Sequence, residues 1–127
     1  QFIRKGIAGE DIVLKSAGTQ YYSYTYVSDV VLGLLMVLLC GVCGEAYNIA
    51  DEKSDIMLRD LASIVAKEAG RKVVFEQPDA VESIGYSRAT KARLESRKLK
   101  ALGWQARYEI ESGIVRTMKV LRDVNLR

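Results

Sequence analysis

Cys40 and Cys43 are the residues of this chain whose spacing most directly suggests chemistry. A Cys-x-x-Cys pair can serve as a redox couple or as half of a metal site. The sequence contains no histidine and no further cysteine, and no basic residue near the pair that would lower a thiol pKa. We therefore predict two buried small side chains in a reducing cytoplasm, and no bound metal.

A basic segment near the end of the chain is the second candidate for chemistry. Its cations are opposed locally only by Glu95, and the whole chain carries a net charge of +3. It could be a solvated face, an anion site in which arginine forks phosphate oxygens, or a nucleic-acid patch. Because no aromatic residues are interleaved with the cations, we expect a solvated face and no nucleic acid. The cations are Arg88, Lys91, Arg93, Arg97, Lys98, Lys100 and Arg107.

The elements that position these residues follow from periodicity and from glycine and proline breaks. We predict one unit over residues 1–127 with a mixed α/β fold. Helices are expected at 2–7, 54–69, 96–102 and 110–121, an apolar helix at 29–40, and extended segments at 11–15, 22–27, 46–49 and 72–76. Ser28 or Asp29 is the predicted cap of the apolar helix, and Ser54 or Asp55 that of the next one.

The apolar run Val30–Cys40 is too short to span a membrane, which needs roughly twenty apolar residues. It is bounded by Asp29 and Glu45, and a helix that is apolar on all faces is usually buried between layers. We therefore predict no membrane contact. If its natural neighbour is missing, part of this helix is exposed, and we expect self-association through that surface.

Three short segments carry a resemblance to a known family. Tyr26-Val27-Ser28-Asp29 opens the apolar helix, Glu45-Ala46-Tyr47-Asn48-Ile49-Ala50 follows it, and Leu102-Gly103-Trp104 comes near the end. In this order they resemble the C-terminal third of an NAD-dependent nucleotide-sugar epimerase/dehydratase, an extended short-chain dehydrogenase/reductase. The resemblance runs from about Ile12 to Val120. It implies that Tyr47, Asn48, Gly103 and Trp104 serve packing, with Gly103 allowing close approach.

The family's reacting centre is missing from this sequence. Its tyrosine is followed four residues later by a lysine, whereas here Tyr86 comes closest, with Lys91 five residues on. The only candidate for its glycine-rich turn, Gly41–Gly44, follows an apolar helix instead of preceding one. We therefore expect a fragment that lacks the glycine-rich Rossmann half. NAD or NADP would bind to the full-length enzyme, and no cofactor to this fragment.

The resemblance also implies which residues meet the substrate. The stretch from Gly18 to Val27 matches a motif whose arginine binds the diphosphate, but Tyr22 stands at that position. A phenol carries no charge at neutral pH, so phosphate binding would shift to Arg88 or Arg93, or the substrate would differ. Gln20, Tyr22, Tyr26 and Arg88 are the predicted substrate-binding residues.

The function expected from these features is the substrate-binding portion of a cytoplasmic NAD(P)-dependent nucleotide-sugar epimerase, dehydratase or reductase. Such an enzyme, an oxidoreductase or isomerase, works by hydride transfer at a sugar carbon, and its partner is a nucleotide sugar. The alternative is a non-catalytic binding or scaffolding domain derived from the same family.

Overall fold

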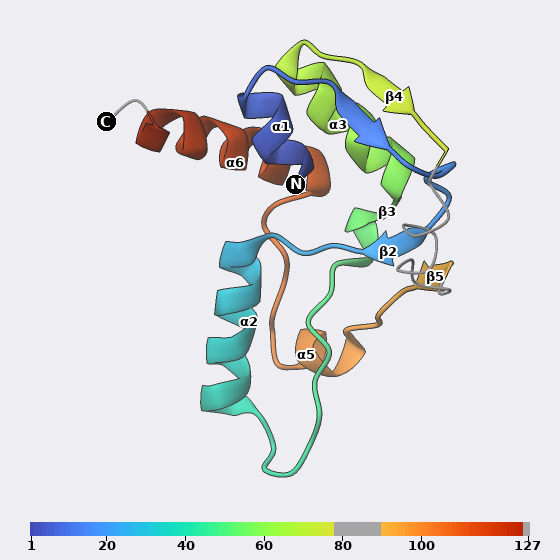
Figure 1. The fold of residues 1–127 in the computed structure, drawn as a ribbon. Helices are drawn as coiled ribbons and strands as arrows, with labels where there is room; N and C mark the ends of the chain where they lie inside the picture. The colour runs from blue at the N-terminus through green and yellow to red at the C-terminus, as the bar shows by residue number, and fades with distance from the viewer. Residues whose placement is uncertain (78–89, 126–127) are drawn as a thin grey trace.

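The computed structural model describes residues 1–77 and 90–125. Figure 1 shows a body of helices and a parallel strand pair, from which an arm extends. The body consists of α1 (Phe2–Ile7), β1 (Ile12–Leu14), α3 (Leu58–Ala69), β4 (Val73–Phe75) and α6 (Ile110–Asn125). The arm consists of α2 (Val27–Cys40), the loop 41–51 and α5 (Arg97–Ala101). Between them lie β2 (Tyr21–Ser23), η1 (Glu52–Ser54), β3 (Asp55–Met57) and β5 (Lys91–Ala92).

The hydrophobic core lies in the body, where α1, α3 and α6 meet the parallel pair β1–β4. The apolar positions of α3 recur every three to four residues, which places them on one face of a helix. Gly70 ends α3 in the left-handed conformation with φ of 64°, as a C-terminal glycine commonly does. The buried residues of this core are Ile12, Leu14, Ala62, Val65, Ala66, Ile114 and Met118.

The second sheet joins the body to the arm. It has the order β3-β2-β5, with β2 antiparallel to β3 and parallel to β5. Tyr21 lies opposite Met57 and Lys91, and Tyr22 lies opposite Ile56 and Ala92. Because side chains alternate along a strand, the neighbours Tyr21 and Tyr22 point to opposite faces of this sheet.

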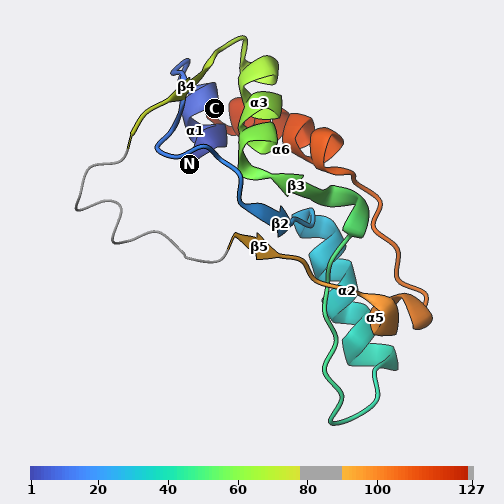
Figure 2. The same ribbon diagram turned by 90° about the vertical axis from the view of Figure 1, so that its right-hand side faces the viewer.

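The buried Trp104 joins the segment after α5 to helix α2. Figure 2 shows α5 beside α2, and Trp104 follows α5 in the chain. Its indole N–H donates to the carbonyl oxygen of Asp29 at 3.0 Å. A Cβ at Gly33 would lie 3.2 Å from the Trp104 Nε1 atom and 3.1 Å from a methyl of Ile49, so glycine allows the close approach here.

The structure corrects several local predictions. Residues 46–49 form no strand, and Asn48 instead donates its side-chain N–H to the carbonyl of Glu95. The N-cap of α2 is Tyr26 and no side chain caps it, so the predicted capping role of Ser28 or Asp29 is wrong. The next helix begins at Leu58, after the unpredicted strand β3, so Ser54 and Asp55 do not cap it. Gly103 has a φ of 97° with open space around a Cβ, so it supplies a turn and not a close approach.

Helix α2 is only partly covered. Leu38 and Leu39 are 78% and 79% exposed, and Val31, Leu34 and Leu35 are each at least half exposed. The expectation that part of this helix is exposed is therefore confirmed, whereas its burial between layers is wrong, because Asp29 and Gly33 are its only buried residues. None of the helices in the described ranges has the length and apolar character needed to cross a bilayer.

Candidate functional site

The predicted substrate residues gather on and around β2. Tyr22 lies in the strand, Gln20 directly precedes it and Tyr26 ends the segment that leads into α2. The three side chains are all half-buried. Arg88, the fourth predicted residue, lies outside the described residues.

Gln20 lies at the body end of this segment. Its carbonyl accepts the N–H of Leu58 at 2.9 Å, which fixes the start of α3 against the start of β2. Its side chain lines a cavity of about 340 Å³ with Lys5, Lys15 and Glu76. The Gln20 Oε1 atom is buried and accepts no hydrogen bond from the part of the chain that the structure describes.

Tyr26 lines a different cavity, of about 370 Å³, beside the first turns of α6. Its ring lies 4.7 Å from that of Tyr108, centroid to centroid, at a tilt of 48°. Tyr24 lines the same cavity, and its burial, with a smaller effect from Tyr22, raises the pKa of its phenol above the ordinary value. The phenol of Tyr24 is therefore neutral at physiological pH and can donate a hydrogen bond. The structure thus places Gln20 and Tyr26 at separate cavities.

A buried carboxylate positions Tyr108 opposite Tyr26. The Asp29 side chain is 1% exposed, and its Oδ2 atom accepts the backbone N–H groups of Arg107 and Tyr108, each at 3.0 Å. The motif drew attention to Asp29, but residue type and spacing alone suggested a cap. A carboxylate near a helix start and a carboxylate that binds a distant loop look the same in sequence, so no local signal reveals this role.

Arg93 does not lie beside Tyr22. Its Nε atom is 2.5 Å from Asp55 Oδ2, and its guanidinium lies 5.7 Å from the centroid of the Tyr21 ring. Tyr21 points to the face of the sheet opposite that of Tyr22. The Asp55 carboxylate raises the pKa of Arg93 and partly neutralises the charge that an anion would meet. Arg93 is therefore poorly placed to take over phosphate binding from position 22.

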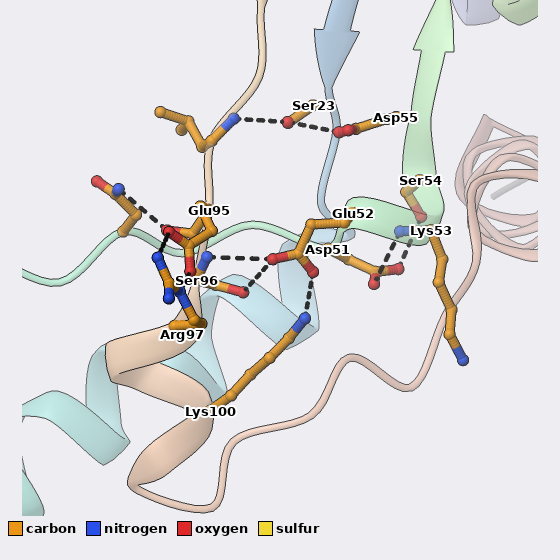
Figure 3. A network of polar contacts seen from close by, with 12 residues as sticks. Ser23, Asp51, Glu52, Lys53, Ser54, Asp55, Glu95, Ser96, Arg97 and Lys100 are labelled. Atoms are coloured by element: carbon orange, nitrogen blue, oxygen red, sulfur yellow. Dashed lines mark hydrogen bonds and ion pairs between the residues drawn. The ribbon is translucent and has the colours of Figure 1, made fainter.

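The basic segment is opposed by acidic residues distant in sequence. Besides Arg93–Asp55, ion pairs join Arg97 to Glu95, Lys98 to Glu45 and Lys100 to Glu52. Figure 3 shows how Glu52 also accepts the backbone N–H and hydroxyl of Ser96, each at 3.2 Å. Glu95 is thus the local partner, three carboxylates distant in sequence add to it, and the ion-paired arrangement favours a solvated face.

The cysteines differ from the prediction as well. Cys40 and Cys43 are free and exposed at the end of α2, so the expected burial is wrong. Within residues 1–77 and 90–125, no group of three or more His, Cys, Asp or Glu side chains is arranged to hold a metal ion.

Known proteins are similar to this chain in sequence and in fold. The model of the NAD dependent epimerase/dehydratase family matches residues 1–50. Two trifunctional UDP-glucose 4,6-dehydratase/UDP-4-keto-6-deoxy-D-glucose 3,5-epimerase/UDP-4-keto-L-rhamnose-reductases of Arabidopsis thaliana are 27% and 30% identical to the chain. The matches cover 93% of this chain and 17% of each plant enzyme, so the chain spans about a sixth of their length.

Solved structures match almost the whole chain. The UDP-glucose 4-epimerase of Thermotoga maritima, solved with UDP-glucose, has a TM-score of 0.81 at 24% identity and covers 98% of this chain and 38% of its own. WbmF of Bordetella bronchiseptica, in complex with NAD⁺ and UDP, has a TM-score of 0.78 at 25% identity and covers 98% and 35%. The predicted resemblance to NAD-dependent epimerases and dehydratases is therefore confirmed. So is the mixed α/β fold, which corresponds to part of such an enzyme.

Proposed function

We propose that this chain is the substrate-binding portion of an NAD(P)-dependent nucleotide-sugar epimerase, dehydratase or reductase. The observation that carries the proposal is the likeness, over 98% of the chain, to a 4-epimerase solved with UDP-glucose and to WbmF solved with NAD⁺ and UDP. In the complete enzyme the cofactor supplies hydride transfer at a sugar carbon. The reacting tyrosine and lysine come from the rest of the polypeptide.

The residues of this chain do not fit the dinucleotide itself. A pyrophosphate is bound where a glycine-rich turn leads into a helix N-terminus, because backbone N–H groups and the positive end of the helix dipole face it. The glycines Gly41 and Gly44 lie instead after the C-terminal end of α2, where carbonyl oxygens and the negative end of the dipole face outward. We therefore propose that the isolated chain binds no NAD(H) and turns over no sugar nucleotide.

The substrate contacts that we propose are Gln20, Tyr22, Tyr26 and Arg88. Their support is that Gln20 and Tyr26 each line a cavity, and that Tyr22 lies between them in the chain, on β2. Arg88 then meets the diphosphate charge in place of the family's arginine, which Tyr22 replaces in this chain. Loss of a hydrogen bond to a charged group weakens binding by roughly 1.5–3 kcal/mol.

Calorimetric titration of the purified chain with NADH, UDP and uridine tests this proposal. We expect no heat with NADH, binding of UDP, and weaker binding of uridine, which lacks the phosphates. Arg88→Ala should lose the preference for UDP, whereas Arg97→Ala, which removes an exposed arginine paired with Glu95, should keep it. Micromolar binding of NADH would refute the proposal that the cofactor binds only to the rest of the polypeptide. Equal UDP affinity of Arg88→Ala and the wild-type chain would show that Arg88 does not bind the diphosphate.

We also propose that the isolated chain self-associates through α2. Val31, Leu34 and Leu38 are more than half exposed and follow one another at spacings of three and four, the pattern of helix–helix contacts. Leu38→Gln should therefore lower the sedimentation coefficient at tens of micromolar. Val120→Gln, at a half-exposed valine on α6, is the matched control. A wild-type chain that sediments as a monomer at this concentration would contradict the proposal.

A further inference from the structure

The two cysteines occupy an exposed corner that the proposed function does not use. Cys40 is the last residue of α2, and Cys43 lies in the turn that follows it. Both thiols are free and exposed, and the sequence contains no other cysteine. The sequence predicts two buried packing residues, whereas the structure leaves both side chains exposed.

Few contacts hold the two residues between the cysteines. Gly41 leaves the helix in an extended conformation, with φ of −71° and ψ of 152°. The Val42 N–H donates to the Tyr47 hydroxyl at 2.9 Å, and the Val42 carbonyl accepts the N–H of Glu45 at 3.2 Å. Gly44 follows with a φ of 82° and open space around it. This corner can therefore change its backbone conformation without disturbing buried side chains.

One additional helical turn would bring the two sulfur atoms together. Residues three apart in a helix have Cβ atoms about 5–6 Å apart, whereas a disulfide needs about 3.5–4.5 Å, so the last turn must also tighten by about 1–2 Å. In the extended conformation of Gly41 the chain moves away from that geometry. Closure therefore requires Gly41 and Val42 to continue α2, and the Val42 N–H then leaves the Tyr47 hydroxyl.

We propose that Cys40 and Cys43 form a thiol–disulfide exchange site whose oxidant is a small-molecule disulfide such as oxidised glutathione. The thiolate of one cysteine attacks a sulfur of that disulfide, which forms a mixed disulfide and releases one small thiolate. The thiolate of the other cysteine then attacks the protein sulfur, forms the Cys40–Cys43 bond and releases the second small thiolate. Both cysteine protons end on the released thiols, so the protein pair is oxidised by two electrons and the small disulfide is reduced by two.

Mass spectrometry of the reduced chain after equilibration with oxidised glutathione tests the site. We expect the wild-type chain to lose the mass of two hydrogen atoms and to retain no adduct. Cys40→Ser and Cys43→Ser should each retain one glutathione, because neither has a second thiol to release it. A wild-type chain that accumulates two glutathione adducts would overturn the proposal, and so would one that forms only disulfides between chains.

A second variant tests the conformational step. The hydrogen bond from the Val42 N–H to the Tyr47 hydroxyl stabilises the conformation in which the two thiols are apart. Tyr47→Phe removes the acceptor of this bond. The equilibrium constant for closure in a glutathione buffer should therefore rise about five-fold, the value of one typical hydrogen bond. Tyr21→Phe, on the distant strand β2, is the matched control and should leave the constant unchanged. An equal constant for Tyr47→Phe and wild type would show that closure does not break this bond.

Discussion

Replacement of Asp29 should cost far more stability than replacement of its neighbour Ser28. The Asp29 carboxylate is buried and accepts two backbone N–H groups, from Arg107 and Tyr108, at 3.0 Å each. A hydrogen bond to a charged group contributes roughly 1.5–3 kcal/mol, and each buried N–H left without an acceptor adds a desolvation cost. Asp29→Ala should therefore lower the free energy of unfolding by about 3–5 kcal/mol, a large part of the ~5–15 kcal/mol that stabilises a typical domain.

Two further variants separate the charge from the position. Asp29→Asn keeps a side-chain oxygen that can accept both N–H groups, so its cost should be about 1–2 kcal/mol, as neutral hydrogen bonds contribute less. Ser28→Ala should cost less than about 0.5 kcal/mol, because Ser28 is exposed and no side chain caps α2.

Urea unfolding followed by circular dichroism measures these differences, provided that the slope m is the same for all variants. Equal losses for Asp29→Ala and Ser28→Ala would refute the role assigned to the buried carboxylate. A loss of about 1 kcal/mol at Ser28 would instead support the cap that the sequence suggested. If Asp29→Ala does not fold, the comparison of Asp29→Asn with Ser28→Ala still decides between the two roles.

Two more predictions concern a glycine and an ion pair. Gly18→Ala should destabilise by at least about 2 kcal/mol and Gly70→Ala by only about 1 kcal/mol, as measured by thermal unfolding. The two glycines have nearly equal φ angles, 63° and 64°. A Cβ at Gly18 would lie 2.8 Å from the Arg59 Cβ, whereas a Cβ at Gly70 meets nothing within 4 Å. Equal losses of stability for the two variants would contradict this argument. The hydrogen bond from Lys100 lowers the pKa of Glu52 from 4.5 to about 2. The contribution of this pair to the free energy of unfolding is therefore complete above pH 4.5 and is lost as the pH falls towards 2. Lys100→Met should flatten the stability curve in that interval, and an unchanged slope would show that the pair contributes nothing.

The helices of the body could be predicted because their signals are local. The apolar residues of α3 share one face and Gly70 ends it, so a short stretch of sequence contains the whole pattern. The strands β1 and β4 can be recognised in the same way, because their apolar residues Ile12, Leu14 and Val73 lie in the buried core or pack against it.

The second sheet and the loop of the arm could not be predicted in the same way. The strands β3 and β5 are only three and two residues long, and they exist because β2 pairs with each of them. Residues 46–49 look like a strand, yet no strand of the described chain lies beside them. The carboxylates that oppose the basic segment are not visible locally either, because Glu45 and Glu52 lie 53 and 48 positions from their lysines.

The proposed substrate residues show what the motif alone cannot predict. The motif points to the segment around β2 because the family pattern is contiguous there, and the substrate contacts of that segment stay a prediction. It did not indicate that Gln20 and Tyr26 border different cavities, or that Arg93 lies on the face opposite Tyr22. Both facts depend on strand register and on helices that pack from elsewhere in the chain.

The contact between Asp29 and the segment after α5 also sets the order in which the protein can fold. The hydrogen bonds of Asp29 join residues 75, 78 and 79 positions apart, and contacts at such separations form slowly because a long loop must close first. During synthesis α2 leaves the ribosome before α5 and Trp104, which follow it in the chain. Until then the apolar residues of α2 have neither α5 nor the indole ring beside them. The interval between the two events is when the nascent chain is most exposed to aggregation.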